Sequence, residues 1–458
     1  MMELNKDIFR EYDIRGVYPT DIDKNTAYLI GRAFASNLKR MGKDKTLVGY
    51  DNRYSSPELE QYLIKGITES GVDVVRLGLV TTPMYYYAWD LLNIKCGVMI
   101  TASHNPKDDN GFKFSYNGIH NAYGDDVKNI YNTIIKQDFT NGNGIIEKAD
   151  IKEAYLKMIP SSINMGEKKL KVVYDCGNGT TAIIAHDIFK DTENIKYIPL
   201  FADSDPTFPN HHPDPAVEEN LRQLKEEVIK NKADLGIAFD GDGDRVGVVD
   251  ELGNMIDIDK YMIIIWRDIC DKVEPKTALF DIKCSKVLED ELIKLNIKPN
   301  CYRTGNSYMK AESVRGNYPF SGELSGHIFF RDKFNGYDDG IYAGLRLIEI
   351  LSKTNKSVTD LLKGINTYYA TRELKRKVTD DTKFQIVDKV KDYCIKNNYK
   401  ILTIDGVKVL FEDGSAIVRA SNTGPNLTMR YEATSENRLN EIKQEFDNLL
   451  DTIINNYK

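Results

Sequence analysis

The sequence predicts an α/β fold, built from successive strand-and-helix units and completed by a smaller α+β unit. The 458 residues exceed what one hydrophobic core usually holds, so about three or four domains of ~100–150 residues are expected. Strand-like apolar segments alternate with helical patterns over most of the chain, which favours mainly parallel sheets covered by helices. After about residue 365, short strands joined by Asp-Gly turns replace this alternation.

The first unit begins the alternation. It is expected to contain a strand, a helix and two more strands, at residues 46–50, 57–71, 72–78 and 96–100. Pro57 would occupy the first turn of the helix, and Gly71 follows its end, as is typical of helix boundaries. Further strand-and-turn patterns of this kind occur at residues 170–189, 233–250 and 276–295. Three successive α/β units are therefore expected.

The C-terminal part has a different pattern. Hairpin turns are expected at Asp405-Gly406 and Asp413-Gly414, and residues 436–454 form an amphipathic final helix. This predicts a separate, mostly antiparallel α+β domain. The predicted domains are residues 1–150, 151–253, 254–365 and 366–458.

Composition limits the classes of function. Hydrophobic residues make up 41% of the chain and charged residues 29%, as in ordinary globular proteins. The longest strongly apolar stretch, at residues 261–266, is far shorter than the ~20 residues of a membrane helix. The charged start of the chain has no apolar core typical of a secretory signal, so the expected location is the cytoplasm.

Net charge and cysteine content limit the kinds of ligand and partner that the chain can be expected to bind. The net charge of -7 does not favour nucleic-acid binding, which usually needs a basic face, and nothing in the sequence indicates an obligatory protein partner. The six cysteines are scattered and form no C-x-x-C pair, which predicts reduced thiols in the core. An anionic ligand would need a local concentration of arginine and lysine.

Three aspartates lie close together in the segment AFDGDGDRVGVV. Asp240, Asp242 and Asp244 alternate with two glycines, which let the backbone turn so that the side chains can converge. Such close like charges repel unless a cation neutralises them, and oxygen ligands favour Mg²⁺ or Ca²⁺. Arg245 follows directly, and a guanidinium beside Mg²⁺ suits phosphoryl transfer.

A calcium loop of the EF-hand type and a metal-free acidic turn are the alternatives for this segment. Counted from Asp240, acids fall at positions one, three and five, and Glu251 falls at position twelve. Position six is Arg245, however, where an EF-hand needs glycine, and the flanking segments are strand-like rather than helical. The sequence therefore favours Mg²⁺.

Ser103 and His104 lie in the segment TASHNP, directly after the expected strand at residues 96–100. Adjacent serine and histidine residues suggest nucleophilic catalysis. Successive side chains of an extended chain point to opposite sides, however, so adjacency alone does not make a catalytic pair. His104 is therefore expected to support the loop, with its side chain diverging from Ser103.

Two later loops carry polar side chains suited to a phosphorylated sugar. Glu323, Ser325 and His327 lie between glycines in FSGELSGHIFF, where a carboxylate and a hydroxyl can bond sugar hydroxyls. The segment VRASNTGPNLTMRY offers donors for a dianion, at Arg419, Ser421, Asn422, Thr423 and Arg430. Taken alone, the segment FSGELSGHIFF is equally well interpreted as a Gly-rich surface turn. The segment VRASNTGPNLTMRY is, taken alone, equally well a hairpin with a polar tip.

Four motifs in one order carry a resemblance to a known family. TASHNP, DGDGDR, GELSGH and RASNT make the chain similar to the α-D-phosphohexomutase superfamily, and especially to bacterial bifunctional phosphomannomutase/phosphoglucomutases. EYDIRG, KFSYNG, PNHHPDP, DIKC and DDGIY match as well. The resemblance covers essentially the whole chain. It implies three α/β domains with mixed sheets and a C-terminal α+β domain of TATA-binding-protein-like shape around a central cleft.

The resemblance also implies the activity and the site. Ser103 would carry a phosphoryl group and, with Asp240, Asp242 and Asp244, bind Mg²⁺. The reaction would interconvert hexose 1-phosphate and hexose 6-phosphate of mannose and/or glucose through a 1,6-bisphosphate, with glucose 1,6-bisphosphate as activator. The residues implied in catalysis are Ser103, Arg15, His104, Lys113, Arg245 and His327.

The general base and the substrate contacts follow from the same resemblance. Lys113, His327 and Arg15 surround the serine in the family, and His327 and Lys113 rank first as bases because of their pKa values. Asn306 stands where the family often has a histidine, which puts the sugar preference in doubt. The implied substrate-binding residues are Tyr12, Lys283, Asn306, Glu323, Leu324, Ser325, Gly326, His327, Arg419, Ala420, Ser421, Asn422 and Thr423.

Three other functions fit parts of the sequence. A phosphoglucosamine mutase is the nearest, although that subfamily usually has Ser-Gly-Thr where this chain has Ser421-Asn422-Thr423. A Mg²⁺-dependent phosphatase with Ser103 as nucleophile would need water at the phosphoserine, which a mutase excludes. A non-catalytic Ca²⁺ module would leave Ser103 and the loop at residues 419–423 without a role.

Overall fold

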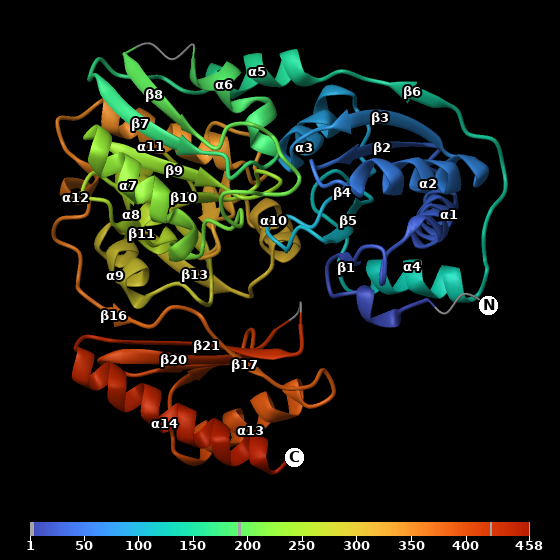
Figure 1. The fold of residues 1–458 in the computed structure, drawn as a ribbon. Coiled ribbons are helices and arrows are strands. Elements are labelled where there is room, and N and C mark those ends of the chain that lie inside the picture. The colour runs from blue at the N-terminus through green and yellow to red at the C-terminus, as the bar shows by residue number, and fades with distance from the viewer. Residues whose placement is uncertain (1–3, 191–193, 422–423, 458) are drawn as a thin grey trace.

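Four β-sheets organise the residues that the computed structural model describes, which are 4–190, 194–421 and 424–457 (Figure 1). The first three sheets are mixed, and the last is antiparallel. Figure 1 shows the first α/β unit in blue beside the second and third in green and yellow, with the C-terminal unit in red beneath them. The predicted class of fold, three α/β units and one α+β unit, is confirmed.

The first sheet carries the Ser103 segment. Its elements are η1 (Lys6–Ile8), β1 (Ile14–Val17), α1 (Lys24–Arg40), β2 (Lys45–Tyr50), α2 (Ser56–Glu69), β3 (Asp73–Leu79), α3 (Thr82–Leu91), β4 (Gly97–Ile100), β5 (Asp109–Ser115), α4 (Asp125–Ile135) and β6 (Ile146–Lys148). The strand order is β1-β5-β4-β2-β3-β6. β4, β2, β3 and β6 are parallel, whereas β5 pairs antiparallel with β4 and β1.

The second sheet carries the aspartate cluster at one end. Its elements are α5 (Lys152–Ser161), β7 (Leu170–Asp175), η2 (Thr180–Ile183), α6 (Ala185–Phe189), β8 (Ile195–Leu200), η3 (Glu218–Leu221), α7 (Arg222–Asn231), β9 (Leu235–Phe239), β10 (Val246–Asp250) and β11 (Met255–Ile256). The order is β11-β10-β9-β7-β8, and β9 and β10 form an antiparallel hairpin. The helical pattern within residues 170–189 is divided into η2 and α6. At the start of η2, the amide of Thr180 donates to the carbonyl of Gly241 in the Asp240–Arg245 segment, at 2.8 Å.

The third sheet is smaller and shares its core with the second. Its elements are α8 (Ile258–Ile269), β12 (Thr277–Asp281), α9 (Lys286–Lys294), β13 (Lys298–Tyr302), α10 (Asn306–Arg315), β14 (Phe320–Gly322), β15 (Ile328–Phe330), α11 (Gly340–Ser352) and α12 (Val358–Leu361). The order is β13-β12-β14-β15. One hydrophobic cluster joins side chains of this unit, the second unit and α3, and Trp266 is fully buried within it. Burial of this shared surface holds the units together.

The C-terminal unit is an antiparallel sheet with two helices on one face. Its elements are β16 (Tyr369–Ala370), β17 (Leu374–Lys377), α13 (Lys383–Lys396), β18 (Ile401–Leu402), β19 (Val407–Leu410), β20 (Gly414–Ala420), β21 (Asn426–Ala433) and α14 (Glu436–Asn455). The order is β16-β21-β20-β19-β18, and β17 also pairs with β21. Both expected Asp-Gly hairpin turns and the final helix are present. Figure 1 shows α13 and α14 on the face of the sheet away from the other units.

The six cysteines are all free thiols, and five of them are buried, as predicted. Among the described residues, the structure contains no helix with the length and apolar character needed to span a membrane.

Asp339 caps α11 from a fully buried position. Its carboxylate accepts hydrogen bonds from the amide of Tyr342 at 2.9 Å and from the hydroxyl of Tyr155 at 2.5 Å. Burial is the main cause that raises the pKa of Asp339 to about 7. The folded protein therefore holds this proton over a pH range in which the unfolded chain, with a pKa of about 3.9, has lost it.

We expect the free energy of unfolding of Asp339→Asn, relative to that of the wild type, to be larger at pH 8 than at pH 5. In the wild type, the contribution of Asp339 to stability is present below about pH 4 and is lost as the pH rises through about 7, by at most ~4 kcal/mol. Asparagine keeps the helix cap without a titrating proton. Urea unfolding midpoints of the variant and the wild type at both pH values measure the effect. A difference that does not depend on pH contradicts it.

Asp23→Asn is the matched control for this experiment. Asp23 caps α1 in the same way, through the amide of Thr26. Burial raises the pKa of Asp23, but hydrogen bonds from Thr26 and Asn25 outweigh this and lower it overall. The wild-type Asp23 therefore stabilises the protein at neutral pH, and this contribution is lost as the pH falls through its lowered pKa. Its replacement by asparagine should reduce stability at pH 8.

Candidate active site

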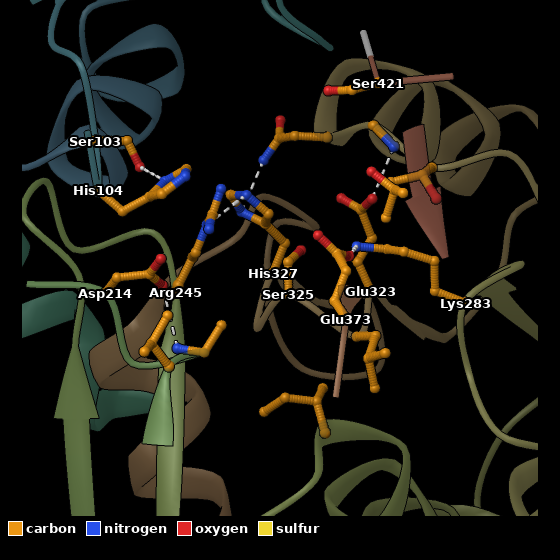
Figure 2. Close-up of a pocket in the computed structure, with 18 of the residues that line it drawn as sticks. Ser103, His104, Asp214, Arg245, Lys283, Glu323, Ser325, His327, Glu373 and Ser421 are labelled. Atoms are coloured by element: carbon orange, nitrogen blue, oxygen red, sulfur yellow. Dashed lines mark hydrogen bonds and ion pairs between the residues drawn. The ribbon is translucent and has the colours of Figure 1, made fainter. Parts of the chain in front are cut away.

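A cavity of about 620 Å³ lies where the four units meet. Side chains from every unit line it, among them Arg15, Ser103, Arg245, Lys283, His327 and Arg419. Figure 2 shows Arg245 and His327 in the middle of this cavity, with Ser103 on one side and Lys283 and Glu373 on the other. The cavity therefore has a nucleophile side and a cationic side.

The Ser103 loop, residues 101–109, comprises the connection from β4 to β5 and the first residue of β5, and it places the serine next to the aspartate cluster. The hydroxyl of Ser103 donates to Oδ2 of Asp240 at 2.6 Å, although the two residues are 137 positions apart. The amide of Ser103 donates to the hydroxyl of Thr101 at 2.7 Å. Ser103 is only 2% exposed and has a φ of 51°, in the left-handed region that few non-glycine residues adopt.

The expectation that His104 diverges from Ser103 is wrong. Nδ1 of His104 lies 3.2 Å from the hydroxyl of Ser103. The rule for extended chains fails here because the left-handed conformation of Ser103 turns the backbone between the two residues. Burial and the nearby positive charge of Arg245 lower the pKa of His104 well below its usual value, so the ring is neutral.

The aspartate cluster lies in the Asp240 loop, residues 240–245, between β9 and β10. One oxygen from each of Asp240, Asp242 and Asp244 lies within 4.8 Å of the others, and all three residues are fully buried. The flanking elements are strands, so the EF-hand alternative lacks its helices.

The cluster fits a hard divalent cation. Oδ1 of Asp242 and Oδ1 of Asp244 are buried and have no hydrogen-bond partner among the described residues, which costs free energy unless a cation binds them. Together with Asp240 they form an all-oxygen donor set of the kind that Mg²⁺ binds. Asp240, Asp242, Asp244 and the oxygen of Ser103 would hold the ion.

Lys113 is paired with this cluster. Its ammonium group lies 3.0 Å from Oδ2 of Asp242 and 2.8 Å from Oδ2 of Asp244. Burial alone would lower the pKa of Lys113, but the charges of the two carboxylates outweigh burial and raise it. Lys113 is therefore a cation in this arrangement, paired with both carboxylates.

His327 has the geometry of an oriented base. Its Nδ1 lies 2.7 Å from Oδ2 of Asp338, which holds the proton on that nitrogen. Its Nε2 accepts a hydrogen bond from Nε of Arg245 at 2.9 Å. The Arg245 amide in turn donates to Oδ1 of Asp240 at 3.1 Å. His327 and Arg245 therefore connect the loop at residues 323–327 to the aspartate cluster.

The loop at residues 323–327 offers polar atoms to the cavity. Oε1 of Glu323 accepts from the amide of Gly305 at 2.7 Å, whereas Oε2 is buried without a partner among the described residues. Leu324 and Ser325 also line the cavity, but Gly326 is not among its lining residues. Asn306 lines it too, donates to Asp338 and leaves its Oδ1 buried without a described partner.

The cationic side of the cavity is held by carboxylates. Lys283 lies 3.1 Å from Glu373, and Arg419 lies 2.8 Å from Asp405. Arg15, which lies on the other side and donates to Asn105 of the Ser103 loop, is paired with Asp13 at 2.7 Å. These carboxylates keep the cationic groups in place and offset part of their charge.

Some of the remaining predicted substrate-binding residues line the cavity, and others do not. Tyr12 and Ser421 line the cavity, and burial raises the pKa of Tyr12 to about 12, so its hydroxyl stays a donor. Ala420 is buried at the end of β20 and is not among the lining residues. Asn422 and Thr423 lie outside the described residues.

Sequence reasoning missed several supporting groups. Asp338 orients His327, and the hydroxyls of Thr82 and Thr101 donate to Oδ2 of Asp242 at 2.7 and 3.0 Å. Asp338 begins the segment DDGIY, which matches the family but does not by itself indicate this role. Glu373 left no sequence signal, because its pairing with Lys283 depends on how the C-terminal unit docks.

Gly241 is where the two loops touch. A Cβ atom added there would lie 2.5 Å from the carbonyl oxygen of Ser103, closer than backbone atoms tolerate. We expect Gly241→Ala to displace the Ser103 loop and to reduce turnover about 10²-fold, since a misplacement of ~1 Å can cost that much. The steady-state turnover number of the purified protein measures the effect.

Gly344→Ala is the control for Gly241→Ala. Gly344 lies in α11, and the three atoms nearest to its added Cβ all belong to the side chain of Ile237, the first being the flexible tip at 3.0 Å. This variant should keep near wild-type turnover. Equal turnover of the two variants would refute the steric argument.

The fold and the site define an enzyme that transfers phosphoryl groups. A buried serine hydroxyl meets three carboxylates suited to a divalent cation, an arginine lies beside them, and further cations face them across the cavity. An intramolecular transfer, in which the phosphoryl group returns to the same sugar, fits a cavity with phosphate-binding groups at both ends.

Comparison with known proteins agrees with this class. Models of phosphoglucomutase/phosphomannomutase match along the chain, as alpha/beta/alpha domain I at residues 6–141, domain II at 153–253, domain III at 257–368 and the C-terminal domain at 373–449. A phosphomannomutase/phosphoglucomutase of Pseudomonas syringae pv. tomato is 42% identical over 96% of this chain and 94% of its own length. A phosphoglucomutase of Neisseria gonorrhoeae is 34% identical over 99% and 98% of the two chains.

A solved structure shows the same fold. The X-ray structure of a phosphoglucomutase/phosphomannomutase family protein from Burkholderia thailandensis superposes with a TM-score of 0.90 at 35% identity and covers 98% of this chain and 97% of its own. This chain belongs to the phosphoglucomutase/phosphomannomutase family, and it is a phosphohexomutase-type enzyme.

Proposed function

We propose that this enzyme interconverts hexose 1-phosphate and hexose 6-phosphate, with mannose and/or glucose as the sugar. The phosphoryl group would pass through a phosphoserine at position 103 and a hexose 1,6-bisphosphate. The observation that carries this proposal is the 2.6 Å contact between the hydroxyl of Ser103 and Asp240, in a cavity whose opposite side carries Lys283 and Arg419. One end of the cavity suits the phosphate being transferred, and the other suits the phosphate that stays on the sugar.

The reaction consists of two phosphoryl transfers. In the first, the bond between phosphorus and Oγ of Ser103 breaks, and a bond forms between phosphorus and the free hydroxyl oxygen of the sugar. The proton of that hydroxyl passes to Nε2 of His327 once Arg245 has released its hydrogen bond to this nitrogen and turned to the phosphoryl group, while Asp338 orients the ring from its other side. After the bisphosphate turns end to end, Ser103 takes the other phosphoryl group and the sugar oxygen recovers a proton.

A divalent ion belongs to this proposal. Mg²⁺ bound by the aspartate cluster would offset the charge of the phosphoryl group and make the serine oxygen a better leaving group. Arg245 would balance further charge on the phosphoryl oxygens. Glucose 1,6-bisphosphate would act as activator by restoring phosphate to Ser103.

Sugar recognition is assigned to the loop at residues 323–327. The unpartnered Oε2 of Glu323 and the hydroxyl of Ser325 would bind the hydroxyls at C3 and C4. Glucose and mannose differ at C2, so contacts at C3 and C4 allow both. The phosphate that stays on the sugar would lie against Arg419 and Ser421. It would displace part of the contact between Arg419 and Asp405. A cytoplasmic location is consistent with the six free thiols.

The test is an assay of the purified enzyme with Mg²⁺ and a trace of glucose 1,6-bisphosphate. Glucose, mannose and glucosamine phosphates are supplied in turn, and both isomerisation and free phosphate are measured. Isomerisation of the glucose or mannose phosphate without phosphate release is the expected result. Rapid phosphate release would identify a phosphatase, and preferential turnover of the amino sugar would identify a phosphoglucosamine mutase.

A further inference from the structure

Arg53 is a buried arginine that binds the backbone of the Ser103 loop. It follows β2 by three residues and is 1% exposed. Its Nη1 donates to the carbonyls of Pro106 and Asp109 at 2.5 and 2.9 Å. Its Nη2 donates to the carbonyls of Ser103 and Asn105 at 2.8 and 2.7 Å. One guanidinium group thus satisfies four carbonyls of a single loop.

The surroundings of Arg53 fix this group in one orientation. Asp51 lies 3.2 Å from its Nε and is itself held by the amide of Arg53 and the hydroxyl of Ser56, at 3.1 and 2.7 Å. The ring of Phe208, from the second unit, covers the guanidinium at 5.6 Å. The planar fork therefore cannot rotate away from the loop without leaving buried groups unpaired.

The Ser103 loop needs such support. Left-handed backbone at a non-glycine residue costs of order 1–3 kcal/mol and persists only where neighbouring groups impose it. Within the loop, backbone bonds join only Asn105 to Ala102 and Asp109 to Pro106. The Ser103 carbonyl that Arg53 binds is also the atom that packs against Gly241 of the Asp240 loop. Arg53 therefore acts on the backbone of the residue that carries the reacting hydroxyl, without being one of the described residues that line the cavity.

We propose that Arg53 is a positioning residue for phosphoryl transfer. It holds four carbonyls of the Ser103 loop so that the serine hydroxyl stays at Asp240, and it does this without touching the substrate. Arg53 is not among the described residues that line the cavity, so its replacement should change the rate of transfer rather than the binding of sugar phosphate. This inference rests on the proposed function.

Arg53→Lys tests the proposal because it keeps the charge and removes the fork. One ammonium group cannot reach four carbonyls in the arrangement that the guanidinium spans. We expect kcat to fall about 10–100-fold and KM to stay within about twofold. Single-turnover transfer from the phosphorylated enzyme to glucose 1-phosphate should slow by the same factor as kcat.

Arg346→Lys is the matched control. Arg346 is equally buried and binds Asp332 with both terminal nitrogens at 2.8 Å, but it lies in α11 and does not line the cavity. It should lower the unfolding midpoint and leave kcat unchanged. An Arg53→Lys enzyme whose kcat equals that of Arg346→Lys, or whose KM rises while kcat holds, overturns the proposal.

Asp51→Asn provides a second variant in case Arg53→Lys does not fold. It removes the charge that aligns Arg53 and keeps the size of the side chain. A smaller loss of kcat at constant KM is expected, and an unchanged kcat counts against the proposal. The wild type is assayed first, because its failure to isomerise any hexose phosphate would reject the proposed function itself. In that case the same variants are compared by the rate at which glucose 1,6-bisphosphate phosphorylates Ser103, where the same loss is expected.

Discussion

Ser103→Ala is expected to lower mutase turnover by about 10⁴-fold or more, as removal of a nucleophile usually does. The hydroxyl is the only group of this side chain that can carry the phosphoryl group, and it lies 2.6 Å from Asp240. The variant should also lack the phosphate of roughly 80 Da that intact-mass spectrometry is expected to find on the wild type. Alanine removes one oxygen and no packing atoms, so the fold should persist.

Ser36→Ala serves as the control for this variant. Ser36 is fully buried in α1 of the same unit, where its hydroxyl donates to the carbonyl of Arg32. It should retain both turnover and the phosphate mass. A Ser103→Ala enzyme that still isomerises sugar phosphates, or a freshly isolated wild type without phosphate on a serine, would remove the basis of the phosphoserine scheme.

Asp242→Asn should have the second largest effect, a loss of turnover on the order of 10³-fold together with a weaker response to Mg²⁺. Oδ2 of Asp242 accepts hydrogen bonds from Thr82, Thr101 and Lys113, and its Oδ1 has no hydrogen-bond partner in the described part of the chain, so a cation can bind it. Asparagine keeps the shape and removes the charge that attracts the ion. Turnover measured against Mg²⁺ concentration, after treatment with a chelator, separates weaker ion binding from a lower maximal rate.

Asp250→Asn is the matched control for Asp242→Asn. Asp250 ends β10, the strand that follows the Asp240 loop, and it is buried and accepts the amides of Leu252 and Asn254. It should need no more Mg²⁺ than the wild type. A common Mg²⁺ dependence for both variants would mean that the cluster does not bind the ion.

The residue types and their spacing predict which side chains form the site, but not which way each side chain points. Asp240, Asp242 and Asp244 were recognised by spacing, since alternate acids with glycines between them have few uses other than a cation. Their contact with Ser103 joins two units of the fold, and only the family resemblance linked them. His104 was misplaced because the left-handed conformation of Ser103 depends on tertiary contacts.

Buried charged residues were the hardest to predict. Arg53 looks like a surface arginine in a loop after a strand, yet four carbonyls of another loop surround it. Lys113 looked like a candidate base, and its pairing with two carboxylates makes it a cation instead. In both cases the partners lie in a loop that is distant in the sequence. The local sequence pattern therefore does not indicate the orientation or the protonation of either side chain.

The central claim is that one divalent ion joins a phosphate on Ser103 to the carboxylates at positions 240, 242 and 244. A crystal structure of the phosphorylated enzyme soaked with Mn²⁺, with anomalous diffraction recorded for the metal, tests it most directly. The account predicts one strong anomalous peak bound by oxygens of all three aspartates and by a phosphate oxygen on Ser103. A peak away from these groups, or an ion bound by the aspartates with no contact to the phosphate, would contradict it.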